Sequence, residues 1–344
     1  MGQRYKGSSR KIKSWRELQR TLIILAIISL FALTPLGFAI SKNNSHNRSQ
    51  NLAISEHHGQ ERSSLNLPFA STPTASPPTP QPILTAQGLP PTITASAVYL
   101  LDADTGHMLA DIDGEKPLQM ASTTKIMTAL IAIQTADLDQ LVPINPDAYN
   151  RAHNNGGSSA NLIVGDQLSL KDLLYGLLLP SGDDAAVAIA DALGGTQAFV
   201  QRMNLFAYRL HLFQTHYTTV DGLTYDENHY STAYDLVQLA QYAMRIPLFA
   251  QIVQTPEYTL AATAQHHFYQ WVTTNKLLTT YPGMIGTKTG HTYQAGWCLV
   301  FAAKRGDHDL IGAILDSPSE SQRDQDTTTL LNWGFSLPLL PPTT

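Results

Sequence analysis

Three short groups of residues in this chain could together carry nucleophilic chemistry, and the first is Ser122-Thr123-Thr124-Lys125. Residues three apart lie on one face at the start of a helix, so Lys125 can reach the Ser122 hydroxyl. A serine attacks poorly until a base takes its proton, and a lysine is a base only where burial or a nearby cation favours its neutral form. The spacing predicts a serine nucleophile with a lysine base; the alternative is a capping serine beside a solvated lysine.

The second group is Ser181-Gly182-Asp183, which follows an apolar stretch ending at Leu179 and precedes an alanine-rich segment. Serine and aspartate in this position are also typical of a helix N-cap. Taken alone, this pattern favours the cap.

The third group is Lys288-Thr289-Gly290, followed by His291 and then by an apolar run at 295–303 that we expect to be a strand. Small residues let a substrate backbone approach a strand edge closely. Lys288 and Thr289 can hold a carboxylate by charge and hydrogen bond. The alternative is a plain turn before the strand.

Hydrophobic patterns predict the elements that position these groups. We expect strands at 96–103 and 107–111, helices from near 122 and at 170–179, 184–193, 197–210 and 232–244, strands at 295–303 and 310–315, and a last helix at 323–335. Strands at both ends with helices between them predict an α+β fold. Its antiparallel sheet would be built from both ends of the domain and flanked by helices, with an inserted, mostly helical lobe.

The first part of the chain has a different composition. Residues 1–20 are basic and are expected to be a cytoplasmic tail, and the uncharged Thr21–Ile40 segment is expected to be a transmembrane signal anchor or a cleaved signal peptide. Either would place the rest of the chain outside the cytoplasm. Residues 41–94, rich in Asn, Ser, Thr and Pro, are predicted to be a disordered linker, and residues 95–337 the catalytic domain.

Charge and cysteine content exclude other classes. The 344 residues carry 22 Lys+Arg against 27 Asp+Glu, and the basic residues of the tail leave the rest of the chain acidic, which argues against a nucleic-acid partner. The single cysteine, Cys298, excludes an intrachain disulfide and is expected to be a buried apolar residue. No metal site or cofactor is predicted, because the paired histidines at 57–58 and 266–267 lack ligand spacing.

The three groups occur in one order within longer matching text: MASTTKIMT at 120–128, LLYGLLLPSGDDAA at 173–186, HYSTAYDLVQL at 229–239 and GTKTGHTYQAGWCL at 286–299. This text resembles the low-molecular-mass penicillin-binding proteins, the D-alanyl-D-alanine carboxypeptidases. The resemblance implies a β-lactamase/DD-peptidase-like fold. It also implies a peptidase that trims the terminal D-alanine from peptidoglycan stem peptides through an acyl-enzyme and is acylated by β-lactams.

Catalytic roles follow from the same resemblance. Ser122 would attack the carbonyl of the penultimate D-alanine, Lys125 would be its base, and Ser181 would relay a proton to the leaving amine. The oxyanion would be held by the backbone N–H groups of Ser122 and His291.

Substrate-binding roles fall to Asp183, Lys288, Thr289, Gly290 and His291, with the lysine and threonine on the terminal carboxylate. Asp183 departs from the family, which usually has asparagine there, because an ionised carboxylate accepts hydrogen bonds but cannot donate them. It would also favour the charged form of the catalytic lysine. From the sequence we therefore expect Asp183→Asn to keep or raise activity.

Three rival functions share some or all of these motifs. A β-lactamase of this fold needs a glutamate for its deacylating water, and no Glu-x-x-x-Asn segment follows Ser181. A non-catalytic penicillin-binding sensor or scaffold is favoured only by Asp183. A D,D-endopeptidase that cuts cross-links shares every motif.

Overall fold

The computed structural model describes residues 83–154 and 156–340. The predicted tail, the Thr21–Ile40 segment and most of the predicted linker lie outside these residues. Within the two described ranges, no helix is both long enough and apolar enough to span a bilayer.

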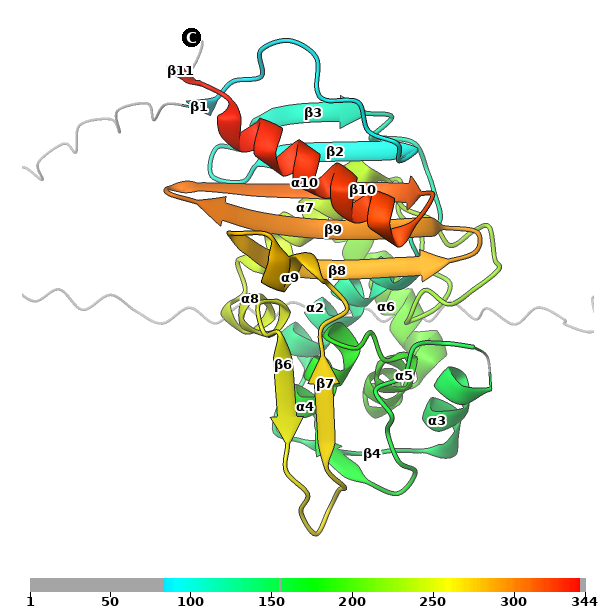
Figure 1. The fold of residues 1–344 in the computed structure, drawn as a ribbon. Helices are drawn as coiled ribbons and strands as arrows, with labels where there is room; N and C mark the ends of the chain where they lie inside the picture. The colour runs from blue at the N-terminus through cyan, green and yellow to red at the C-terminus, as the bar shows by residue number, and fades with distance from the viewer. Residues whose placement is uncertain (1–82, 155, 341–344) are drawn as a thin grey trace, which may run out of the picture. The chain divides into compact units, whose positions relative to one another are not determined.

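A five-stranded antiparallel sheet forms the upper part of the domain (Figure 1), in the order β3-β2-β10-β9-β8. Its strands are β2 (Ala97–Asp102), β3 (Met108–Ile112), β8 (Met284–Thr292), β9 (Gly296–Arg305) and β10 (His308–Ser317). Because β2 pairs with β10, the first hairpin of the domain joins the last one. The α+β prediction, with a sheet built from both ends, is confirmed.

Helices cover both faces of this sheet. Helix α10 (Glu320–Ser336) packs on one face and α7 (Ala233–Met244) on the other. Successive side chains of a strand point to opposite faces, so Val98 and Leu100 pack in one hydrophobic cluster with α10 and Tyr99 packs in the other. Every residue of β2 is therefore buried.

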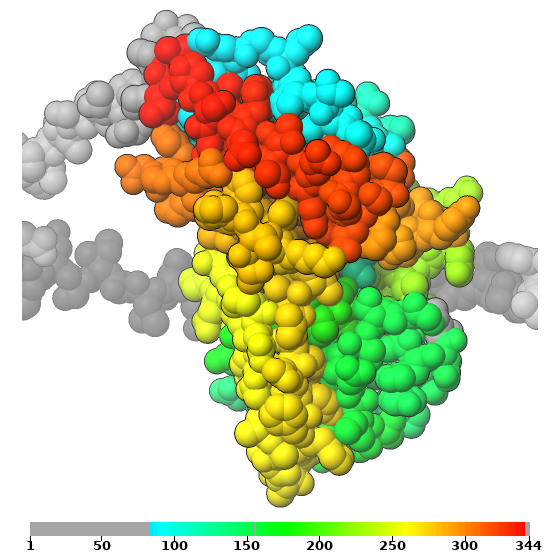
Figure 2. Space-filling model, in the orientation of Figure 1, coloured from blue at the N-terminus to red at the C-terminus, as the bar shows by residue number. Residues whose placement is uncertain are grey.

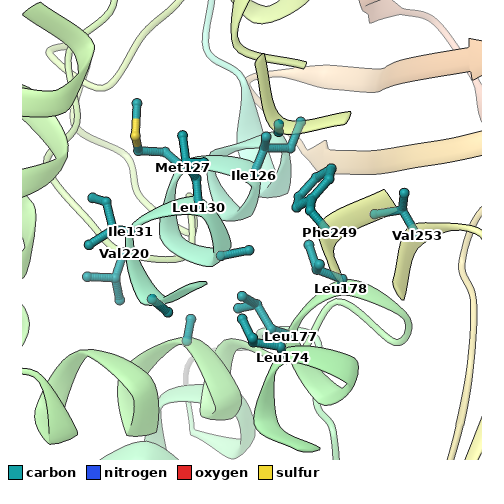
Figure 3. Packing of buried hydrophobic residues seen from close by; sticks show 14 of the residues in the cluster. Ile126, Met127, Leu130, Ile131, Leu174, Leu177, Leu178, Val220, Phe249 and Val253 are labelled. Atoms are coloured by element: carbon teal, nitrogen blue, oxygen red, sulfur yellow. The ribbon is translucent and has the colours of Figure 1, made fainter. Parts of the chain in front are cut away.

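The inserted lobe is built around α2 (Lys125–Thr135), whose first eight residues are all buried. An apolar surface on all sides of a helix requires neighbours all round it. Figure 3 shows side chains of α2 beside those of α4 and α8. The other helices are α3 (Pro146–His153), α4 (Leu170–Leu178), α5 (Asp183–Ala192), α6 (Thr196–Arg209) and α8 (Pro247–Val253).

Several short elements were not predicted: β4 (Leu141–Pro143) paired with β5 (Gln167–Ser169), β6 (Glu257–Leu260) paired with β7 (Tyr269–Val272), and α9 (Leu277–Thr280). In Figure 1 the β6–β7 hairpin extends away from the sheet along the lobe, and Figure 2 shows it as the yellow ridge beside the green part of the lobe. The Lys288-Thr289-Gly290 group, predicted to lie before a strand, lies inside β8, which forms the edge of the sheet.

The end of the predicted linker contacts the domain. Strand β1 (Ile83–Leu84) pairs with β11 (Leu339–Leu340), and Leu84 is buried. Thr94 donates both its backbone N–H and its hydroxyl to Asp326 of α10. Residues 83–94 therefore pack as part of the folded unit.

Candidate active site

Ser122 lies in a 3-10 turn, η1 (Ala121–Thr124), that runs directly into α2. Ala121, the residue before it, has a φ of 47°, a left-handed conformation that costs a non-glycine residue free energy. The Thr124 hydroxyl donates to the Ala121 carbonyl at 2.7 Å. Gly222 packs against this carbonyl so closely that a Cβ there would lie 2.0 Å from its oxygen. Buried contacts thus hold the turn in its strained shape.

A buried histidine supports the same turn. His229 Nδ1 accepts the Thr218 backbone N–H at 3.0 Å, so the neutral ring carries its proton on Nε2, which lies 2.8 Å from the Thr124 hydroxyl. Burial lowers the pKa of His229 to about 4. His229 stands in the sequence that carries the family resemblance, but no role was predicted for it.

Lys125 is fully buried beneath Ser122. Its Nζ lies 2.8 Å from Ser122 Oγ, 2.5 Å from Asp183 Oδ1 and 3.0 Å from the Asp221 carbonyl. An ammonium has three protons and no acceptor capacity, so three acceptors around one Nζ match the charged form. The predicted approach of lysine to serine is present, but this environment favours an ammonium rather than a neutral amine.

Asp183, the first residue of α5, is almost as buried as Lys125, which it contacts. Its Oδ2 accepts the Ser158 N–H at 3.0 Å, and Gly157 approaches so closely that a Cβ would clash with this oxygen. Burial raises the pKa of Asp183 to about 6, although the charge of Lys125 acts in the opposite direction. The carboxylate is therefore fixed against the lysine, with one oxygen committed to the backbone.

A second ion pair lies behind the first. Asp221 accepts two hydrogen bonds from Arg151, at 2.5 and 2.8 Å, while its backbone carbonyl faces Lys125. The guanidinium holds the pKa of the Asp221 carboxyl below its ordinary value against the opposing effect of burial. This pair fixes the loop that supplies the third acceptor of Lys125.

Ser181, between α4 and α5, has a φ of 67° and is buried. Among the described residues its Oγ has no hydrogen-bond partner. A buried unpaired hydroxyl costs about 1–3 kcal/mol, so it is typical of a group that meets a ligand.

Strand β8 forms a second wall of the site and faces η1. Lys288 is buried, and its Nζ donates to the Thr289 carbonyl at 3.0 Å. Burial lowers the pKa of Lys288 well below its ordinary value, and the nearby charge of Lys125 lowers it further. The Thr289 hydroxyl lies 2.6 Å from that of Thr274.

Gly290 brings this wall against η1, the turn that contains Ser122. A Cβ at Gly290 would lie 2.9 Å from the Met120 carbonyl oxygen and 3.1 Å from the Ser122 nitrogen. Only a glycine therefore fits without displacing the backbone. The next residue, His291, stacks on Trp297 with 3.9 Å between ring centroids.

A cavity of about 290 Å³ opens between the two walls. Its lining combines residues of all three predicted groups with residues that were not predicted: Ser122, Gly156, Gly157, Ser158, Ser181, Thr274, Thr289, Gly290, His291, Trp297, Glu320 and Arg323. Lys125 and Asp183 lie behind this lining through their contacts with Ser122 and Ser158. The predicted site residues thus meet at one cleft.

Arg323 is the main site residue that the sequence analysis missed. It begins the predicted last helix, and its side chain is almost fully buried, with the guanidinium 5.9 Å from the Trp297 ring centroid. It donates to Asp324 and lies 3.7 Å from Glu320. A single arginine in a helix has no spacing that would mark it from sequence.

A larger cavity of about 480 Å³ lies elsewhere, bordered by parts of α5, α6 and residues 218–221. Arg151 and Asp221 line it, and none of the predicted site residues does. The chemistry-bearing groups therefore select the smaller cleft.

Comparison with known proteins places the chain in a family. A family model described as D-alanyl-D-alanine carboxypeptidase matches residues 84–319. The D-alanyl-D-alanine carboxypeptidase of Streptomyces sp. (strain K15) is 40% identical over 260 residues, covering 72% of this chain and 89% of that protein. DacF of Bacillus subtilis (strain 168) is 33% identical over 70% of this chain and 62% of its own length. The chain belongs to the D-alanyl-D-alanine carboxypeptidase family, as its motifs predicted.

Solved structures agree with this assignment. The crystal structure of the Streptomyces K15 DD-transpeptidase matches with a TM-score of 0.69 and 39% identity, covering 73% of this chain and all of that one. The D-alanyl-D-alanine carboxypeptidase of Mycobacterium tuberculosis H37Rv matches with a TM-score of 0.68 and 32% identity, over 76% of this chain and 99% of that one. The DD-peptidase-like fold is confirmed.

Proposed function

We propose that the chain is a serine D-alanyl-D-alanine carboxypeptidase that removes the terminal D-alanine from peptidoglycan stem peptides through a Ser122 acyl-enzyme. The main support is the 2.8 Å contact of Lys125 Nζ with Ser122 Oγ at a cleft whose other wall is the Lys288-Thr289-Gly290 strand. This arrangement combines a nucleophile, a proton-transfer group and a cationic edge.

Substrate binding uses the strand wall. The terminal carboxylate is held by the Thr289 hydroxyl and by the positive charge of Arg323, both of which line the cleft. Lys288, buried behind this wall, is stabilised as an ammonium when the carboxylate arrives. The scissile carbonyl then lies over Ser122.

Acylation follows as the Ser122 hydroxyl attacks that carbonyl. The developing oxyanion accepts hydrogen bonds from the backbone N–H groups of Ser122 and His291, which are brought together by the close approach at Gly290. Each such donor contributes about 3–4 kcal/mol of transition-state stabilisation. Ser181, whose hydroxyl has no partner among the described residues, relays a proton to the leaving D-alanine amine. Water then hydrolyses the ester.

A β-lactam would enter the same cleft. Its carboxylate takes the place of the terminal D-alanine carboxylate, and its strained amide acylates Ser122. The leaving nitrogen stays tethered to the acyl group, so water is kept away and the adduct persists.

The site of action would be outside the cytoplasm, as expected of an enzyme acting on cell-wall peptide. Support for a membrane tether comes from sequence only: a basic tail followed by the uncharged Thr21–Ile40 segment. A fractionation of cells expressing the full chain, with and without residues 1–40, tests that tether.

Transfer to an amine is a second candidate activity, because the Streptomyces K15 relative is described both as a carboxypeptidase and as a DD-transpeptidase. Cleavage of cross-links is a third, because an endopeptidase has the same motifs. Product analysis separates them: a donor peptide gives D-alanine and a shortened peptide, an added amine gives a transfer product, and a cross-linked dimer gives two monomers.

The decisive experiment is mass spectrometry of the purified chain after treatment with penicillin. We expect a single covalent adduct on the peptide that contains Ser122 and none in Ser122→Ala. An adduct on any other residue, or equal labelling of the variant, would exclude this function.

A further inference from the structure

The contact between Lys125 and Asp183 carries an inference that rests on the proposed function and goes beyond it. Both side chains are buried, and Asp183 Oδ1 lies 2.5 Å from Lys125 Nζ. The remaining Nζ contacts are Ser122 Oγ and the Asp221 carbonyl. An ammonium surrounded in this way has no lone pair with which to accept the serine proton.

We infer that Asp183 is a positioning residue for proton transfer: it holds Lys125 as the ammonium and receives one of its protons when Lys125 takes the proton of Ser122. The carboxylate contacts the same Nζ atom that contacts Ser122 Oγ. Its second oxygen is fixed by the Ser158 N–H, so Oδ1 stays directed at the lysine. Two consecutive contacts therefore join the hydroxyl to the ammonium and the ammonium to the carboxylate.

The step balances in atoms and charge. As the Ser122 Oγ–C bond forms, the Oγ–H bond breaks and its proton moves to Lys125 Nζ, while an Nζ proton moves to Asp183 Oδ1. Lys125 remains an ammonium, Asp183 becomes a carboxylic acid, and the negative charge passes to the carbonyl oxygen of the tetrahedral intermediate. When the intermediate collapses, the leaving nitrogen takes up a proton and the carboxylate is restored.

The charges around Asp183 favour this role. Lys125 of α2 contacts it, and Asp221 with its partner Arg151 of α3 and Lys288 of β8 are close enough to influence titration in this group. Burial raises the pKa of Asp183 to about 6. A carboxylate with a raised pKa is a stronger base than an exposed aspartate, yet it stays mostly ionised at neutral pH.

The experiment measures the acylation rate by a fluorescent penicillin from about pH 5 to about pH 9 in the purified chain. In the wild type we expect the rate to fall as the pH drops through about 6, because a protonated Asp183 cannot accept. Asp183→Asn keeps an acceptor for the Ser158 N–H but removes the base. We expect its rate at neutral pH to fall by at least about tenfold, and the fall in rate near pH 6 to be lost, because the group that titrates there has been removed.

Asp166→Asn is the matched control. It also removes a buried carboxylate, one that accepts from Tyr269 and His267 in the lobe and does not line the cleft. Its acid limb should coincide with that of the wild type. Equal or faster acylation by Asp183→Asn, the outcome expected from the sequence alone, would overturn the inference, and so would an unchanged pH profile.

Failure of the proposed function gives a different result. If the wild type forms no adduct on Ser122, the function is wrong; if it forms one and Asp183→Asn titrates like the wild type, only the inference is wrong. If circular dichroism shows that Asp183→Asn does not fold, the pH profile of the wild-type acylation rate tests the inference instead. A rate that stays constant down to about pH 5 then contradicts the inference, and a limb near pH 6 supports it.

Discussion

The cleft has a helical wall, formed by η1, α2 and the start of α5, and a strand wall, formed by β8. Each wall buries a lysine, but the surroundings of the two Nζ atoms differ. On the helical wall, Lys125 contacts three acceptors, one of them the carboxylate of Asp183. On the strand wall, Lys288 has one acceptor within the described ranges, the carbonyl of Thr289, and no ion pair. A buried charge without a counter-ion is costly, and burial lowers the pKa of Lys288 well below its ordinary value.

This difference corresponds to the two functions proposed for the cleft, which are proton transfer at the helical wall and substrate binding at the strand wall. The contacts of Lys125 on the helical wall are complete in the absence of substrate, as the proposed proton transfer would require, because groups that must move protons gain from being positioned in advance. Lys288 on the strand wall has no negative partner among the described residues, and the terminal carboxylate of a substrate could supply one. Substitutions on the strand wall should therefore change binding, unless they disturb the other wall.

Gly290→Ala should have the largest effect on the acylation rate, because its added Cβ on the strand wall would displace backbone atoms of the helical wall. The added Cβ would press on the Met120 carbonyl and the Ser122 nitrogen, both backbone atoms that cannot rotate away. Displacing one oxyanion donor should slow acylation by about 10²–10³-fold. Labelling kinetics with fluorescent penicillin measure this rate.

His291→Ala is the control for that experiment. It removes the ring that stacks on Trp297 but keeps the backbone N–H, so its acylation rate should fall far less. If Gly290→Ala acylates at the wild-type rate, the two walls do not meet as closely as the structure places them.

His229 supports the helical wall, and its effect should appear in the pH dependence of stability. Its pKa falls from 6.5 to about 4 on folding, so between these values the unfolded chain binds a proton that the folded chain does not. Stability should therefore decrease as the pH falls through this window, by about 3 kcal/mol from this group. Denaturant unfolding at several pH values measures the slope.

His229→Gln removes the titration, so its stability should decline less steeply with acid than that of the wild type. The variant should also be less stable at neutral pH, because the contact with Thr124 is altered. His107→Gln changes an exposed histidine and should leave the slope as it is. Equal slopes in wild type and His229→Gln would show that the buried ring does not resist protonation.

The sequence predicted the parts of the fold whose hydrophobic pattern is strong. Strands β2, β9 and β10 are apolar runs, and the main helices have apolar faces, so both kinds of element were found. Strand β8 was not, because Gly286, Lys288 and Gly290 interrupt any alternation in it. The β6 and β7 strands have only four residues each, a run so short that its alternation is a weak signal without the pairing between the two strands.

The contacts of the site also divide into those that the sequence could predict and those that it could not. Contacts within one short motif follow from spacing, so the approach of Lys125 to Ser122 could be predicted. The Asp221 carbonyl and the Arg323 side chain reach the site through tertiary packing, from loops and helices with no motif of their own. The protonation of Lys125 depends on this packing, so spacing alone could not give it.

Arg323 should give the smallest effect, one confined to binding. Arg323 lines the cleft, so its positive charge could meet a substrate carboxylate there, although it also pairs with Asp324. Arg323→Gln should raise KM for a D-alanyl-D-alanine peptide about tenfold, equivalent to about 1.4 kcal/mol, with kcat little changed, because the contact is equally strong in ground and transition states. Arg323→Lys keeps the positive charge but lacks the planar guanidinium, so its KM should lie between those of the wild type and Arg323→Gln. Lys276→Gln, which breaks an exposed pair with Glu320 at 2.7 Å, should change neither constant by more than about twofold. A fall in kcat at constant KM for Arg323→Gln would place this residue in the transition state and remove the division between a binding wall and a proton-transfer wall.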